Sequence, residues 1–288
     1  MRMTVMRAAL TAALSFFALP AFSQTKLPKS ETYKDIIEKA YNLSLQRDRT
    51  QALNILSSAI QRETRPQAVA ELKKTVSEVS NIFFSDKSQQ LYETGVSLRK
   101  ADVNQALDKV SEAARIEPDN FPIVIEMARL MIAKGDCKAG LETVKKQLLV
   151  VPFDEDLKLT QAQALACQTK WPEYQKVYDT VAVKKSPLQK YWYALEVQKF
   201  LDLNNPLKTQ ETLGLLKKAD EKYPESFYWQ WKVAHSQKRM NTEQAQKYVM
   251  TCKNISANQY RQYMIDPMLC RRVLEVEGEL KGMNGTTE

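Results

Sequence analysis

Apolar residues recur at helical spacing along almost the whole chain, and this period constrains the fold more than any other feature. One stripe runs through Ile36, Ile37, Ala40 and Leu43, and similar stripes follow one another with short breaks. No run of residues alternates apolar and polar side chains between turn signals, so the sequence predicts no strands. The prolines fall between the stripes, where a proline can begin a helix without interrupting one: Pro66, Pro118, Pro152, Pro172, Pro187 and Pro224.

The pattern therefore predicts an all-α chain of about fourteen helices. Residues 281–288 are expected to form a flexible tail after the last helix. The predicted helices cover residues 31–47, 50–63, 66–83, 86–100, 103–116, 120–134, 137–149, 154–168, 171–184, 187–202, 208–222, 225–239, 242–254 and 257–280.

The residue composition excludes several kinds of site. Only 7 of the 288 residues are glycine, so glycine-rich phosphate-binding loops are not expected. The chain has one histidine, and its four cysteines lack the spacing of a zinc or redox pair, so we predict no metal site and no cofactor. No nucleophile, zinc-protease or nucleotide-binding motif is present, and we therefore expect no enzymatic activity.

Residues 1–23 have the layout of a secretory signal peptide. Arg2 and Arg7 precede an apolar run over residues 8–19, and a small-residue end at residues 21–23 follows. The apolar run is about twelve residues long, whereas a helix that spans a bilayer needs about 20. We therefore predict a cleaved signal peptide, with an uncleaved membrane anchor as the alternative.

Removal of this segment would leave a short leader over residues 24–30 and no transmembrane segment. We therefore expect an exported protein, in the periplasm or, alternatively, outside the cell. The full chain has 42 basic and 34 acidic side chains, and the two signs are interspersed. Because a nucleic-acid-binding protein concentrates its basic residues beside a reading element, no nucleic-acid partner is expected.

The spacing of two prolines adds a repeat to this helical pattern. Pro118 and Pro152 are 34 residues apart, and the sequence around them resembles the tetratricopeptide repeat, a helix–turn–helix unit of that length. In that family small residues let the two helices cross closely, and a proline ends the second helix. The resemblance is clearest over about 87–154 and fair over 33–66, with a generic helical bundle as the alternative. The matching residues are Ala106, Ala113 and Pro118 in the unit that begins at Lys87, and Ala128, Gly140 and Pro152 in the unit that begins at Phe121.

The resemblance implies an α-solenoid over residues 31–280, in which stacked hairpins share a continuous core. The first helices of such hairpins line a concave groove, which in this family commonly holds an extended peptide or a partner's helix. The basic side chains that line this groove would bind carboxylates or a peptide C-terminus. The alternative is that these basic residues are ordinary solvated helix residues. Carried over position by position, the groove residues are Arg99, Lys100, Ile125, Arg129, Leu159 and Gln163.

Four cysteines in an exported chain suggest two disulfides, with three possible connectivities. The repeat frame favours a bond between Cys137 and Cys167, which it places at the turn ends of adjacent hairpins. It also favours a bond between Cys252 and Cys270 on the last two helices, where it would fasten the C-terminal end of the array.

All four tryptophans lie in the second half of the chain, three of them within dense aromatic runs. Neighbouring residues on a helix point to different sides, so a run cannot be wholly buried on one side. Either the rings pack between helices and along their outer surface, or they form a patch that binds a peptide or a glycan. Tyr193 and Trp229 are the candidates for such a patch.

These patterns lead to two hypotheses about function. The first is an exported, non-catalytic scaffold or adaptor that binds another envelope or secreted protein, or a peptide, in its concave groove. The second is a module that binds cell-wall glycan or peptide through the aromatic-rich C-terminal half. The sequence leaves the identity of the partner and the oligomeric state open, including homo-oligomers formed through the end helices.

Overall fold

The computed structural model describes residues 31–239 and 241–284. Contacts divide the chain into two compact units, Met1–Thr32 and Tyr33–Glu288, and nearly all described residues belong to the second. The predicted signal peptide over residues 1–23 and the leader over residues 24–30 lie outside the described residues. Within the described ranges, no helix combines the length and the apolar character needed to cross a bilayer.

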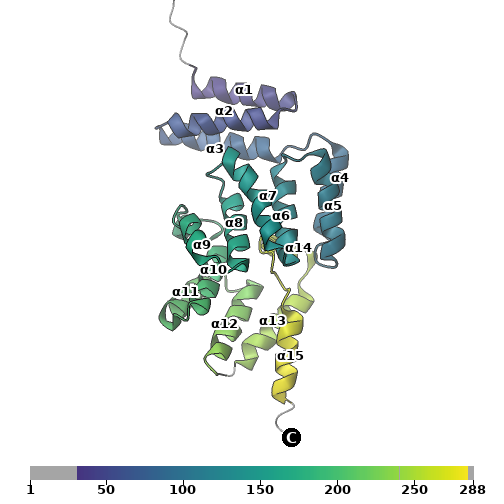
Figure 1. Cartoon of the computed structure of the whole chain (residues 1–288), viewed down its shortest axis with the longest axis vertical. Helices are drawn as coiled ribbons and strands as arrows, with labels where there is room; N and C mark the ends of the chain where they lie inside the picture. The colour runs from purple at the N-terminus through teal and green to yellow at the C-terminus, as the bar shows by residue number, and fades with distance from the viewer. Residues whose placement is uncertain (1–30, 240, 285–288) are drawn as a thin grey trace, which may run out of the picture. The chain divides into compact units, whose positions relative to one another are not determined.

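Every regular element in the described part of the second unit is helical, which confirms the predicted all-α class (Figure 1). The first seven helices are α1 (Tyr33–Leu45), α2 (Arg49–Arg62), α3 (Pro66–Asn81), α4 (Asp86–Leu98), α5 (Val103–Ile116), α6 (Phe121–Ala133) and α7 (Cys137–Val150). The later elements are α8 (Glu155–Cys167), α9 (Trp171–Tyr178), the short 3-10 helix η1 (Val183–Lys185), α10 (Gln189–Asp202), α11 (Pro206–Ala219), α12 (Pro224–Ser236), α13 (Thr242–Asn254), α14 (Ala257–Tyr263) and α15 (Val273–Asn284).

The last predicted helix, over residues 257–280, is wrong as a single element. α14 ends at Tyr263 and α15 begins at Val273, with consecutive turns between them. In this stretch Pro267 has no amide hydrogen to donate, and Cys270 has a backbone φ of 56°, which a right-handed helix does not allow. The break changes the course of the chain before its final helix.

Neighbouring helices pack as hairpins, and the hairpins stack in order. α4 packs on α5, α6 on α7 and α10 on α11. The first helices of successive hairpins also lie side by side, α6 against α8, α8 against α10 and α10 against α12. Before them, α1, α2 and α3 pack on one another, and α3 contacts α6. Each hairpin thus buries its apolar stripe against the next, which is typical of a helical repeat array.

The turns inside five of the described hairpins repeat one backbone geometry. In each, a residue after the first helix has a positive φ, between 50° and 88°. The amide of this residue donates a hydrogen bond to the carbonyl three residues before it. The amide of the following residue donates to the carbonyl five residues before itself, and the two bonds together form a Schellman cap. The last four are spaced by 34, 35 and 34 residues, so the repeat continues beyond the stretch in which the sequence motif is clear. The five residues are Arg47, Gly135, Thr169, Asn204 and Lys238.

Glycines lie where the two helices of a hairpin cross most closely. A Cβ atom on Gly140 would lie 2.9 Å from the carbonyl oxygen of Ala128 and 2.9 Å from Cγ1 of Ile132. A Cβ atom on Gly95 would lie 2.5 Å from Cγ2 of Val110. Neither crossing has room for a methyl group, so these two positions set the distance between the paired helices.

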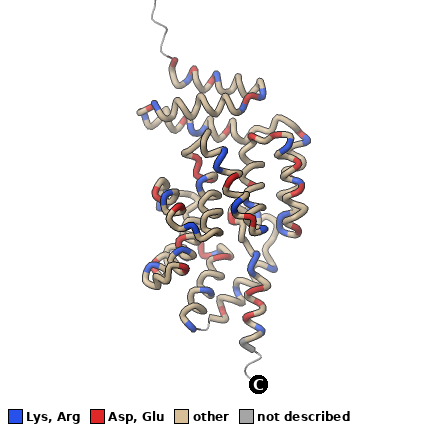
Figure 2. The backbone as a smooth tube through the Cα atoms, viewed as in Figure 1, with Lys and Arg blue, Asp and Glu red and all other residues tan. Residues whose placement is uncertain are grey.

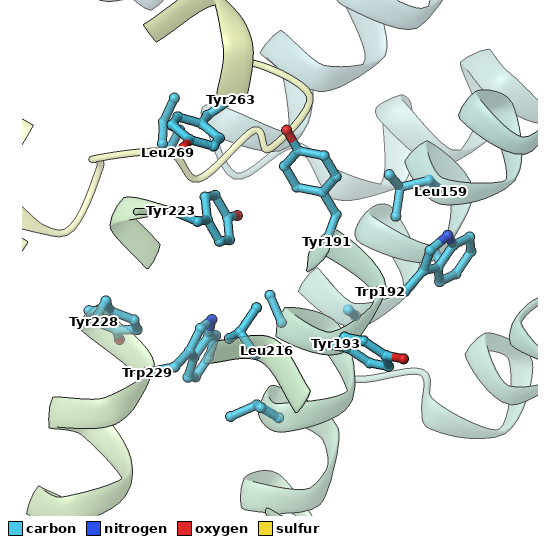
Figure 3. Packing of buried hydrophobic residues seen from close by; sticks show 14 of the residues in the cluster. Leu159, Tyr191, Trp192, Tyr193, Leu216, Tyr223, Tyr228, Trp229, Tyr263 and Leu269 are labelled. Carbon is cyan, nitrogen blue, oxygen red and sulfur yellow. The ribbon is translucent and has the colours of Figure 1, made fainter. Parts of the chain in front are cut away.

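Among the described residues, the buried apolar side chains form three clusters, and the largest lies mostly in the second half of the chain. All four tryptophans belong to this cluster, and Trp192 and Trp231 are fully buried. Figure 3 shows aromatic rings from several helices meeting in its interior. Tyr191 and Tyr223, for example, pack edge to face with ring centroids 5.5 Å apart. The aromatic runs therefore pack largely between helices.

We expect Gly140→Ala to lower the free energy of unfolding by about 1–3 kcal/mol, because the added methyl group would press on the backbone of Ala128. Gly214→Ala is the matched control. Gly214 is exposed on α11, a Cβ atom added there would have no neighbour within 4 Å, and alanine favours a helix over glycine by about 1 kcal/mol. Urea unfolding of both variants checks this. Unchanged stability in Gly140→Ala would contradict the tight crossing.

Candidate functional site

A segment near the C-terminus folds back onto the row of first helices. We call residues 255–272 the closing segment; it comprises Ile255, α14 and the turns that follow, and it lies just before α15 in the chain (Figure 1). We call the face that it contacts the inner face, formed by Arg99 and Lys100 at the end of α4 and by the neighbouring parts of α6, α8 and α10. These contacts join parts of the chain that are far apart in sequence.

The inner face holds the closing segment by its backbone carbonyls. Four side chains of the inner face each donate a hydrogen bond to one carbonyl oxygen, over distances of 2.8–3.0 Å. Carbonyl oxygens are common to all peptides, so these contacts bind the path of the chain rather than its side chains. The pairs are Arg99 with Asp266, Lys100 with Ile255, Gln163 with Ile265 and Tyr191 with Gln262.

Arg99 makes more polar contacts at this interface than any other residue of the inner face. Its side chain is fully buried, and Nη1 lies 2.9 and 2.8 Å from the two carboxylate oxygens of Glu126 on α6. Nη2 donates to the carbonyl of Asp266, and the backbone carbonyl of Arg99 accepts from Nη2 of Arg271 at 2.6 Å. A buried guanidinium needs a paired charge, which Glu126 supplies. Arg99 thus connects α4, α6 and the closing segment.

Four of the five other groove residues expected from the sequence are also buried. Arg129 pairs with the carboxylate of Asp156, while Ile125 and Leu159 lie in the hydrophobic core. Of the six residues assigned to the groove, Lys100 has an exposed side chain. With the closing segment in place, the inner face is therefore an interface within the chain.

Tyr193 and Trp229, the two candidates for an aromatic patch, lie in the core as well. Trp229 lines a cavity of about 210 Å³, together with Tyr191, Tyr223 and Asp266 of the closing segment. Figure 3 shows how the rings of Tyr191, Tyr223 and Trp229 lie relative to one another. Neither Tyr193 nor Trp229 presents an exposed ring face on which a sugar could stack.

A disulfide and an ion pair fasten the closing segment to α12 and α13. Cys270 is bonded to Cys252 on α13, with Cα atoms 5.4 Å apart. Glu225 in the first turn of α12 accepts a hydrogen bond from the Cys270 amide at 2.8 Å and another from Nη1 of Arg272 at 2.7 Å. The Arg272 guanidinium also lies 4.4 Å from the ring centroid of Tyr228. The end of the closing segment is therefore fixed covalently and electrostatically.

The second disulfide joins Cys137 at the start of α7 to Cys167 at the end of α8, with Cα atoms 6.1 Å apart. Both pairings are those that the repeat frame favoured. The carboxylate of Glu225 lies within 4.8 Å of the sulfur atoms of Cys252 and Cys270. Sulfur atoms bonded to each other are not the thiolates that bind metals, so this cluster is a structural fastening.

A second surface feature is a groove of about 550 Å³ bordered by α7, α8 and α9, which we call the lysine groove. Elsewhere basic and acidic residues are interspersed along the helices (Figure 2). In the sequence Lys145-Lys146 is typical of a solvated basic pair and does not indicate a groove; the one available signal is Leu148-Leu149 shortly after it on the same helix. The lining residues are Lys145, Lys146, Lys158 and Lys176, the apolar Leu148, Leu149, Pro152 and Val177, and Glu142, Gln161 and Thr180.

Comparison with solved structures finds a repeat protein that is similar to this chain. A solved tetratricopeptide repeat protein from Parabacteroides merdae is 16% identical, with a TM-score of 0.42 over 85% of this chain and 88% of that chain. No family model matches this chain, and no curated protein matches it. The fold is an array of tetratricopeptide-like hairpins. This description rests on three observations: the turns that repeat every 34 or 35 residues, the close approach of paired helices at Gly95 and Gly140, and the stacking of hairpins in chain order.

We expect Arg99→Met to lower the free energy of unfolding by about 3–5 kcal/mol, because it leaves the buried carboxylate of Glu126 without a partner. The double variant Arg99→Met/Glu126→Met should recover part of that loss, since no unpaired charge remains buried. Denaturant unfolding of the parent and both variants measures the difference. Equal losses in the single and double variants would contradict the claim that the unpaired carboxylate of Glu126 contributes to the loss.

Burial raises the pKa of Glu225 from its ordinary 4.5 to about 7, against the opposing effect of the Arg272 charge. Between these two pH values the folded chain keeps a proton that the unfolded chain has released. Stability should therefore fall as the pH rises through this window. Glu225→Gln has no titrating group and should lose this part of the pH dependence. Equilibrium unfolding over a pH series checks the prediction, and an identical slope in both proteins would contradict it.

Proposed function

We propose that this chain is an exported, non-catalytic scaffold that binds a partner protein. The observation that carries the proposal is the inner face, which binds a peptide segment through backbone carbonyls with side chains from several hairpins. Stacked hairpins present long rows of side chains, and such surfaces suit the recognition of another chain. The array is thus built to hold polypeptide.

The buried charged side chains support the non-catalytic part of the proposal. Arg49 on α2 is fully buried and binds Glu117 at the end of α5 at 2.9 Å, and Glu225 binds Arg272. A catalytic acid or base would face a cleft that a substrate can enter. These charges instead connect separate helices, and each has its partner within the chain.

Two disulfides support export, because such bonds form and persist in oxidising compartments. The layout of residues 1–23 favours the same route through the cell membrane. Of the exported locations, the periplasm is the one we propose, with another envelope protein as the partner.

The partner binds at a surface that the closing segment leaves open. Displacing that segment from the inner face would require competition with a tethered chain, which the Cys252–Cys270 bond keeps at high effective concentration. The alternative of a glycan-binding module has no comparable support, because Tyr193 and Trp229 are buried.

Site-specific photo-crosslinking of the full-length chain in a Gram-negative host tests this proposal. The photoreactive residue replaces, one at a time, Glu93, Leu149 or Leu207, which are exposed on three different hairpins, or Lys100 at the inner face. We expect a discrete adduct with a second protein from at least one of the first three positions and none from Lys100. The chain released by osmotic shock should begin at Gln24.

Two results would contradict the proposal. One is the absence of any discrete adduct from Glu93, Leu149 and Leu207. The other is a chain that stays in the cytosol with its N-terminal segment intact. An adduct from Lys100 alone would instead place the partner on the inner face.

A further inference from the structure

We propose that the lysine groove docks an acidic, amphipathic segment of the partner protein, in which apolar residues are flanked by carboxylates. The proposal rests on the proposed function and adds to it the surface and the chemistry of the partner. The hydrogen bonds that hold the closing segment do not involve the lining residues of the groove. The groove is therefore available while both disulfides are intact.

The floor and edge of the groove are apolar. Leu148 and Val177 are partly buried in it, and Leu149 at the end of α7 is 86% exposed. Covering an exposed leucine with apolar atoms of a partner removes its surface from water, which favours association. The groove's volume of about 550 Å³ accommodates side chains of a partner rather than a flat surface.

The charge around this floor is positive. The one acidic lining residue, Glu142, pairs with Lys145 at 2.9 Å, which leaves the three other lysines of the groove without a carboxylate among its lining residues. Burial, together with the charge of Lys73, lowers the pKa of Lys158 against the opposing charges of Glu155 and Asp154. Positive charges are thus crowded at one side of the groove, and a carboxylate from a partner would be attracted there.

The combination of apolar floor and lysine rim selects a protein segment over other polyanions. Nucleic-acid sites use aromatic rings for base stacking or arginine forks for base edges, and the lining residues include neither. An anionic membrane would meet the lysines but would not enter the hollow. A peptide segment can place its apolar side chains in the hollow and its carboxylates at the rim.

Fluorescence anisotropy with the full-length, oxidised protein tests the proposal. The probe is a labelled peptide of leucines flanked by glutamates, and its companion carries glutamine at each glutamate. The groove variant is Lys145→Glu/Lys176→Glu. The control variant, Lys217→Glu/Lys218→Glu, makes the same charge change on exposed residues of α11 outside the groove. Circular dichroism confirms that both variants are folded.

We expect the parent and the control variant to bind the glutamate peptide, and the groove variant to bind it at least about tenfold more weakly. The glutamine companion should bind more weakly than the glutamate peptide, and Leu149→Ser should weaken binding through the apolar contact alone. Equal binding by the groove and control variants would overturn the proposal, as would equal binding of the two peptides. Binding of phosphatidylglycerol vesicles or RNA without binding of the peptide would overturn it too.

The crosslinked adducts separate this proposal from the proposed function. If Glu93 or Leu207 yields a partner adduct that the groove variant retains unchanged, the scaffold function stands and the groove is not the docking site. If no position yields an adduct, the scaffold function fails, and the peptide measurements alone decide whether the groove binds acidic segments.

Discussion

A helical hairpin cannot bury its apolar face alone, and the rest of this structure follows from that constraint. Each hairpin packs on the next through a row of first helices, and the two helices of a hairpin approach closely where Gly95 and Gly140 replace larger side chains. The side of this row that forms the inner face would still be exposed to solvent. Here the closing segment supplies the cover, and Arg99 connects it to α4 and α6.

This arrangement divides the surface of the helical unit by role. The inner face uses its polar side chains on the carbonyls of the closing segment, and its two arginines from the expected groove are neutralised by Glu126 and Asp156. The lysine groove, in contrast, carries more positive charge than its single lining carboxylate can balance. The first surface satisfies its charges within the chain, and the second leaves them for a partner.

Local sequence signals predict much of the array. The apolar stripes and the prolines between them give the helices, the 34-residue spacing gives the repeat, and that frame gives the partner of each cysteine. The closing segment escaped prediction because its contacts join Arg99 to residues more than 160 positions later, and no periodic pattern encodes such a pair. The repeat frame placed Arg99 on the inner face, but its burial depends on Glu126 in the following hairpin.

The closing segment also has a consequence for the order in which the protein can fold. The chain is synthesised from its N-terminus, so every hairpin from α4 to α12 emerges before Ile265 and Asp266 exist to occupy the inner face. Until then Arg99 and Glu126 are exposed to water, and apolar side chains on the row of first helices are exposed to other nascent chains. A chain interrupted shortly before its end would retain nearly all its helices and still be prone to aggregate.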